Sequence, residues 1–162
     1  MVDMKLVHMK QLKLSMGFSL IEMMVVISIV AILAAIAIPS FQSIIRNQRI
    51  KNSSYEMFTS LMVARSEAIK RNTDITVAPV TAGSWKDGWT ISAGGTVLKN
   101  QEALKGIAVS GAPASLTYKR TGRLSAAATP FQFDINPADS NFIRCITIEL
   151  SGLPRTKKGA CS

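Results

Sequence analysis

The most informative reactive side chain in this sequence is a carboxylate, Glu22, which lies in an otherwise apolar stretch. Residues 18–38 contain two other polar side chains, Ser19 and Ser28. A charge at the centre of a bilayer costs roughly 2.5–3.5 kcal/mol on insertion scales. A carboxylate in such a stretch therefore indicates a function, and its chemistry would be to pair with a nearby cation.

The apolar stretch is long enough to cross a membrane. As a helix, residues 18–38 would measure about 32 Å, against a hydrocarbon core of about 30 Å. Three lysines precede it, and Lys and Arg flanking a membrane segment tend to stay in the cytoplasm. The sequence therefore predicts a cytoplasmic N-terminus and an exported C-terminal part. The lysines are Lys5, Lys10 and Lys13.

Two cysteines, Cys145 and Cys161, fall in the predicted exported part. An oxidising compartment favours a disulfide between them. The bond would close a loop of about 15 residues and contribute roughly 3 kcal/mol in the chain-entropy model. Two free thiols remain the alternative. Because no CxxC pair or Cys/His cluster is present, we expect no metal site.

Other catalytic chemistry is absent from the sequence. The only histidine is His8, near the N-terminus, and we find no phosphate-binding glycine loop, no Ser/His/Asp set and no closely spaced carboxylate pair. General acid–base catalysis usually needs such groups. We therefore expect no enzyme, no cofactor and no small-molecule substrate.

The N-terminal sequence has three interpretations. A secretory signal could be cleaved after the A-x-A pattern at residues 35–37, but its apolar region would be unusually long and would contain Glu22. An unprocessed membrane anchor explains the length but not the glutamate. The third interpretation rests on Gly17-Phe18-Ser19-Leu20-Ile21-Glu22, which resembles the processing site of type IV pilins and pseudopilins.

This resemblance implies cleavage between Gly17 and Phe18 by a prepilin peptidase, followed by N-methylation of Phe18. Residues 1–17 would be the leader, residues 18–38 the transmembrane and filament-core helix, and residues 39–162 the periplasmic domain. The protein would be a single-pass inner-membrane protein before it joins other pilin subunits through the N-terminal helix. The new α-amine would then be the cation that pairs with Glu22.

Beyond the apolar stretch, apolar residues recur at steps of three and four to about Arg71, which predicts an amphipathic helix. Pro39 is expected to kink this helix rather than end it. After a polar break at residues 72–74 the pattern changes to short strands separated by turn residues. The expected strands are 75–80, 89–92, 96–98, 107–109, 115–119, 131–135 and 143–150.

Three later segments resemble the FimT/GspH branch of minor pilins and pseudopilins: ARSEAIKRN (64–72), WKDGWTI (85–91) and TGRLS (121–125). The resemblance implies an α+β fold in which a long bent helix packs on two antiparallel sheets. Asp-Gly within WKDGWT predicts a tight turn between two tryptophans. We expect those rings to pack in the core or on the turn, with ligand stacking as the alternative.

The chain carries a net charge of +9, and its C-terminal part contributes a basic cluster. The predicted Cys145–Cys161 bond would place three cations in one closed loop, which could contact phosphates of DNA. FimT members that bind DNA during natural transformation carry Gly-Arg-x-Arg in the region that corresponds to residues 152–155. Gly152 and Arg155 match this motif, whereas Leu153 replaces its first arginine. The candidate DNA-binding residues are Arg144, Gly152, Arg155, Lys157 and Lys158. For these C-terminal residues, a solvated loop or a subunit contact is the alternative to DNA binding. Lys119, Arg120 and Arg123 form a second basic cluster.

The sequence thus predicts a minor type IV pilin that assembles into or primes a pilus and could bind DNA. A GspH-like minor pseudopilin of a type II secretion system is the alternative. Both would use the same N-terminal processing and helix, so the N-terminal motif does not separate them.

Overall fold

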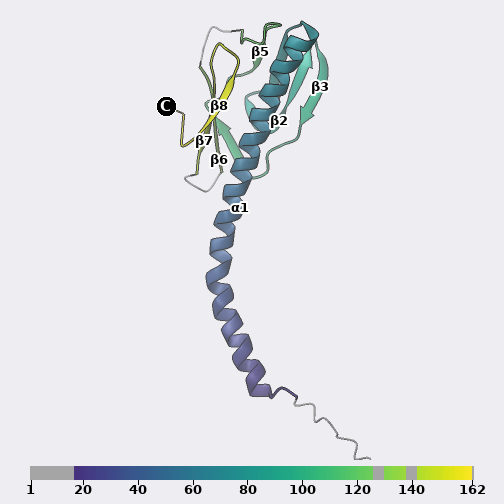
Figure 1. The fold of residues 1–162 in the computed structure, drawn as a ribbon. Helices are drawn as coiled ribbons and strands as arrows, with labels where there is room; N and C mark the ends of the chain where they lie inside the picture. Colours follow the sequence, from purple (N-terminus) through teal and green to yellow (C-terminus); the bar gives the residue numbers. More distant parts are fainter. Residues whose placement is uncertain (1–16, 126–129, 138–141, 162) are drawn as a thin grey trace, which may run out of the picture. The chain divides into compact units, whose positions relative to one another are not determined.

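The protein is seen here in a computed structural model that describes residues 17–125, 130–137 and 142–161. The predicted leader therefore lies outside the described residues except for Gly17. Helix α1 (Leu20–Arg71) precedes eight strands in the described residues (Figure 1). These are β1 (Ile75–Thr81), β2 (Ser84–Ala93), β3 (Thr96–Gln101), β4 (Ile107–Ser110), β5 (Leu116–Tyr118), β6 (Phe131–Pro137), β7 (Arg144–Ile148) and β8 (Pro154–Lys158).

Helix α1 continues through position 39 and ends at Arg71, where the amphipathic pattern also ends. Asn72 follows with a left-handed φ of 51°, a conformation common just after a helix C-terminus. Lys70 and Arg71 lie in the last turn, where cations interact favourably with the helix dipole. The chain divides into two compact units, with the boundary after Phe41.

The strands form two four-stranded antiparallel sheets, as the α+β prediction required. The first sheet has the order β3-β2-β1-β5 and the second has the order β4-β6-β7-β8. Strand β8 pairs on one side with β7 and forms an edge of the second sheet. Figure 1 shows the strands gathered beside the C-terminal half of α1.

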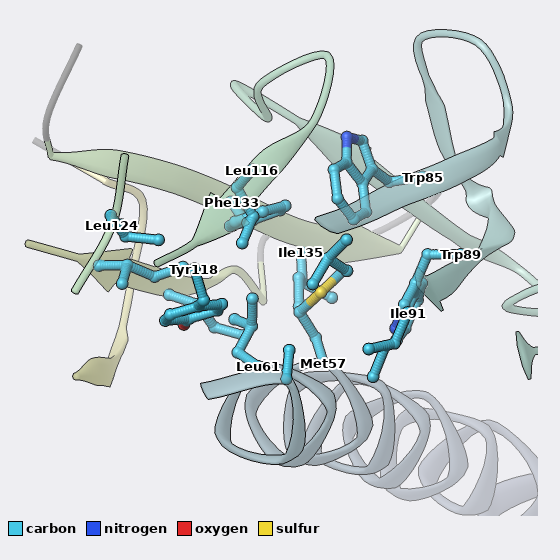
Figure 2. Packing of buried hydrophobic residues seen from close by; sticks show 14 of the residues in the cluster. Met57, Leu61, Trp85, Trp89, Ile91, Leu116, Tyr118, Leu124, Phe133 and Ile135 are labelled. Atoms are coloured by element: carbon cyan, nitrogen blue, oxygen red, sulfur yellow. The ribbon is translucent and has the colours of Figure 1, made fainter. Parts of the chain in front are cut away.

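The core lies between the C-terminal half of α1 and the two sheets (Figure 2). Met57 and Leu61 of α1 are fully buried against aromatic side chains from both sheets. Trp85 of β2 and Phe133 of β6 meet edge to face, with ring centroids 5.0 Å apart. Because these rings come from different sheets, their contact helps to join the two sheets.

The predicted turn within WKDGWT is wrong. Strand β2 runs through this segment, and the turn that joins it to β1 lies at residues 82–83. Gly88 allows β2 to continue through this segment: its φ of +96° favours glycine, and a Cβ atom there would lie 2.2 Å from the carbonyl oxygen of Gln101. Trp85 and Trp89 are 1% and 0% exposed, so they form part of the core and do not offer a face to a ligand.

The chain enclosed by the two cysteines is a β-hairpin, whereas the sequence indicated one strand followed by a basic loop. Residues 144–148 and 154–158 form a hairpin of β7 and β8, so the single strand expected at 143–150 is shorter and is followed by another. The disulfide Cys145–Cys161 is present, as predicted. The disulfide ties the residues after β8 to β7. It therefore helps to hold β8 in place, although β8 is polar and has a low intrinsic strand propensity.

Candidate functional site

Ser19 caps the N-terminus of α1. Its hydroxyl accepts a hydrogen bond from the backbone N–H of Glu22 at 3.2 Å, and its carbonyl accepts one from Met23 at 3.2 Å. Ser-x-x-Glu is the sequence pattern of a capping box, a signal that our sequence analysis overlooked. The cap places Glu22 in the first helical turn, near the positive end of the helix dipole.

The apolar stretch around Glu22 is exposed within the chain. Phe18, Leu20 and Ile36 are 76%, 79% and 70% exposed. By length and composition α1 is the one helix among the described residues able to cross a membrane, with a mean hydropathy of 2.8 in its most apolar window. A continuous apolar surface of this size needs lipid or protein to cover it.

The predicted DNA-binding residues divide between two faces of the β7–β8 hairpin. Thr156 lies on the face toward α1, because its hydroxyl is 3.4 Å from the hydroxyl of Ser54. Side chains alternate along a strand, so Arg155 and Lys157 lie on the opposite, outer face. Lys158 shares the inner face with Thr156, and its cross-strand partner is Arg144.

On the inner face, Arg144 and Lys158 line a cleft of about 350 Å³ between α1 and the hairpin. Lys51 of α1 lines the same cleft, together with the apolar side chains of Ile50 and Phe142. Lys51 was not among the predicted site residues. The sequence carried no signal for it, since it lies more than 90 positions before Arg144 and only the fold brings the two together.

Gly152 holds the β7–β8 turn against the turn at residues 119–123. Its φ is +75°, and a Cβ atom there would lie 2.1 Å from the carbonyl oxygen of Gly122. Leu124 donates its backbone N–H to the carbonyl of Leu150 at 3.3 Å in the same contact between segments. A glycine at position 152 is therefore required by packing, whatever else this position does.

This contact brings the second basic cluster next to the start of β8. Lys119 is partly neutralised because its ammonium group lies 2.8 Å from the carboxylate of Asp74. The hydrogen bond from Lys119 lowers the pKa of Asp74 below its usual value. Arg120 and Arg123 are exposed on the same turn, and Leu153, where the DNA-binding members have arginine, is 42% exposed.

Asp134, Cys145 and Cys161 lie close enough to resemble a metal-ligand group. The two sulfur atoms are joined in the disulfide and are therefore not available as thiolate ligands. The carboxylate of Asp134 accepts a hydrogen bond from the backbone N–H of Cys161 at 2.7 Å. The cluster thus fixes the C-terminal segment to β6 and β7.

Two family models match this chain. The model for the type II transport protein GspH matches residues 54–152, and the model for the prokaryotic N-terminal methylation motif matches residues 17–38. The first match spans more than half of the chain. The chain belongs to the GspH family. The predicted FimT/GspH resemblance is therefore confirmed.

Solved structures show that the GspH-family fold seen here is shared with known pilin-like proteins. The type IV minor pilin FimU of Pseudomonas aeruginosa is 21% identical, with a TM-score of 0.62 over 71% of this chain and 96% of that chain. The minor pseudopilin EpsH of the Vibrio cholerae type 2 secretion system is 22% identical, with a TM-score of 0.53 over 68% and 97%. No curated protein sequence matches significantly.

The GspH-family match and the methylation motif together make the chain a minor pilin or minor pseudopilin. Proteins of this kind act within filaments with other pilin subunits, as structural rather than catalytic components. The matches do not separate a pilus subunit from a secretion subunit.

Proposed function

We propose that this chain is a minor subunit of a type IV pilus. Its leader is removed after Gly17 by a prepilin peptidase, and Phe18 is then methylated. Residues 18–38 hold the subunit in the inner membrane, with residues 39–162 in the periplasm, until the same helix enters the filament. The observation that carries this proposal is the exposed apolar part of α1 with one carboxylate in its first turn.

The energetics of Glu22 support an additional cation. A carboxylate in the first helical turn gains typically about 0.3–1 kcal/mol from the helix dipole. A charge at the bilayer centre costs roughly 2.5–3.5 kcal/mol, so the helix dipole offsets only part of a cost on that scale. The α-amine that cleavage creates at Phe18, or the same group of a neighbouring subunit, supplies the rest. Such a pair also fixes the axial register between subunits.

Mass spectrometry of the membrane-extracted protein tests the processing step. The expected mature chain begins with methyl-phenylalanine at position 18. An intact Met1 or a start at Ile38 would contradict the proposal. In cells, Glu22→Ala should enter filaments much less than the wild type, whereas Ser28→Ala, a polar-to-apolar change on the same helix, should enter normally.

A minor pseudopilin of a type II secretion system is the alternative, since it would use the same processing and helix. The basic outer face of β8 supports the pilus, because a pilus meets extracellular polyanions and a pseudopilus contacts exported proteins. Deletion of the gene separates the two. Loss of pili with normal secretion is expected, and normal pili with blocked secretion would favour the alternative.

DNA binding is a second candidate function, and the outer face of β8 would be the binding surface. Arg155 and Lys157 project on this face, and the Gly122–Gly152 contact brings Arg120 and Arg123 to the same end of the strand. Several exposed cations near one another can neutralise neighbouring phosphates of a duplex.

The two faces of the hairpin provide a matched test. For the full chain in detergent, Arg155→Gln with Lys157→Gln should weaken duplex binding and reduce the slope of log K against log salt by about 2. Arg144→Gln with Lys158→Gln removes the same charge from the inner face and should change the slope little. Equal losses in both variants would show a diffuse charge effect and no outer-face site.

A further inference from the structure

We propose that the inner cleft, formed by Lys51, Arg144 and Lys158, binds the carboxylates of an acidic segment from a different subunit of the filament. This inference rests on the assembly role proposed above. It assigns the cleft a partner other than DNA and separates the inner from the outer basic residues by function.

The cleft concentrates positive charge in a small volume. Its three cations are among the residues that line a space of about 350 Å³, a volume within the range of ligand-binding pockets. Asn47 adds a side-chain amide, and no carboxylate of the described residues lines the space. Within the same described part of the chain, the three cations form no ion pair.

The arrangement on the strands is unfavourable without an anion. Arg144 and Lys158 are directly opposite each other in the β7–β8 register. Like charges in this position destabilise a sheet, by an amount comparable to the stabilisation from favourable cross-strand pairs. A carboxylate placed between them would reverse the sign of this interaction, and Arg144 could bind it with two parallel hydrogen bonds.

The shape of the cleft favours a polypeptide over a duplex. Its volume corresponds to roughly a dozen water molecules, which is room for one or two side chains. A duplex carries its phosphates on a convex cylinder, which contacts exposed groups such as Arg155 more easily than groups inside a cleft. The cleft also has an apolar wall, where Phe142 is 54% exposed, so an apolar residue beside the acid would gain contact area.

The net charge of the chain identifies the kind of partner. Without the leader, which carries three lysines and one aspartate, the chain has a net charge of +7 (9 − 2), and a second copy with the same charge would be repelled at long range. An acidic segment on another kind of subunit would be attracted, and its charge would also discriminate against self-association. The cleft is therefore suited to a contact between unlike subunits.

Peptide titration of the full chain in a zwitterionic detergent tests this proposal. The probe is acetyl-Glu-Glu-Phe-amide, with acetyl-Gln-Gln-Phe-amide as its uncharged counterpart. We expect the glutamate peptide to bind at least tenfold more tightly than the glutamine peptide. Arg144→Gln with Lys158→Gln should weaken its binding at least tenfold, whereas Arg155→Gln with Lys157→Gln should change it less than twofold.

Several outcomes would overturn the proposal. These are equal losses in both double variants, no preference for the glutamate peptide, or tighter binding of inorganic phosphate than of the peptide. Asp139 precedes Phe142 by three residues in the sequence, so Asp139→Asn is a further control. A tenfold gain in peptide affinity for that variant would mean that the chain fills its own cleft.

Two measurements separate a failure of this inference from a failure of the assembly role. The thermal midpoint of the inner double variant should be unchanged or higher, which excludes loss of folding as the cause of weak binding. Glu22→Ala should lose assembly while retaining peptide affinity, because Glu22 lies outside the cleft. Loss of peptide binding in Glu22→Ala would contradict the independence of the two sites.

Discussion

Replacement of Gly152 by alanine tests whether this position is reserved for packing. The backbone at Gly152 has a φ of +75°, and a Cβ atom would meet the carbonyl oxygen of Gly122 at 2.1 Å. The Gly122 carbonyl cannot move away freely, because it also accepts a hydrogen bond from Nε of Arg65 at 3.0 Å. We therefore expect the two turns to separate or the backbone to distort.

The structure provides a control with the same φ. Gly83 also has a φ of +75°, but no atom lies within 4 Å of its Cβ position. A left-handed conformation costs a residue with a side chain about 1–2 kcal/mol, and the stiffer unfolded chain offsets about 0.4–1 of this. Gly83→Ala should therefore cost about 1 kcal/mol. Overpacking typically adds about 1–3 kcal/mol, so Gly152→Ala should cost about 2–4 kcal/mol.

Urea unfolding of the full chain in detergent measures both values, with fluorescence of the buried Trp85 and Trp89 as the signal. The difference between their free energies of unfolding measures the cost of the close Cβ contact alone, because both variants share the backbone strain. If the two free energies agreed to within about 0.5 kcal/mol, the close contact at Gly152 would not exist in solution. Gly152→Ala would then also become a valid test of direct DNA contact, which the predicted destabilisation and separation of the two turns would otherwise confound.

Two other changes have clear expected effects on stability. Replacement of Cys145 and Cys161 by alanine should lower the free energy of unfolding by about 3 kcal/mol, from their sequence separation of 16, and an unchanged urea midpoint would contradict this. Burial raises the pKa of Tyr118, despite the opposing charge of Arg65, and its hydroxyl has no partner in the described part of the chain. Because the folded pKa exceeds the unfolded value of about 10, stability should be constant below pH 10 and fall by about 1.4 kcal/mol per pH unit above it. Tyr118→Phe should be nearly neutral at pH 7 and should lack this alkaline loss in urea titrations at pH 10 and 11.

The sequence predicted the parts of the fold that depend on local pattern. The helix ends at Arg71 because the apolar period stops there and polar residues follow. The pairing of Cys145 with Cys161 followed from the number of cysteines and the expected compartment. The arrangement of two sheets came from the family resemblance, since strand pairing over long distances leaves little local signal.

Two strands were misjudged because tertiary contacts override local preference. Asp-Gly usually favours a hairpin turn, but Gly88 instead lets β2 pass close to the backbone at Gln101. Residues 154–158 are polar and lack an apolar alternation, so they gave no strand signal. They form β8 because β7 offers a partner edge and the disulfide holds the residues that follow.

The candidate site shows why a sum of charges is a poor guide to function. Counted along the sequence, Arg155, Lys157 and Lys158 form one basic cluster. Once residues 154–158 are known to be a strand, alternation places the first two on the outer face and Lys158 on the inner face. The position of Lys51 opposite Lys158 depends on how α1 packs on the second sheet, which no short segment encodes. The same residues therefore support two binding surfaces of different shape, and only variants chosen by face, at equal charge, can show which ligand each surface takes.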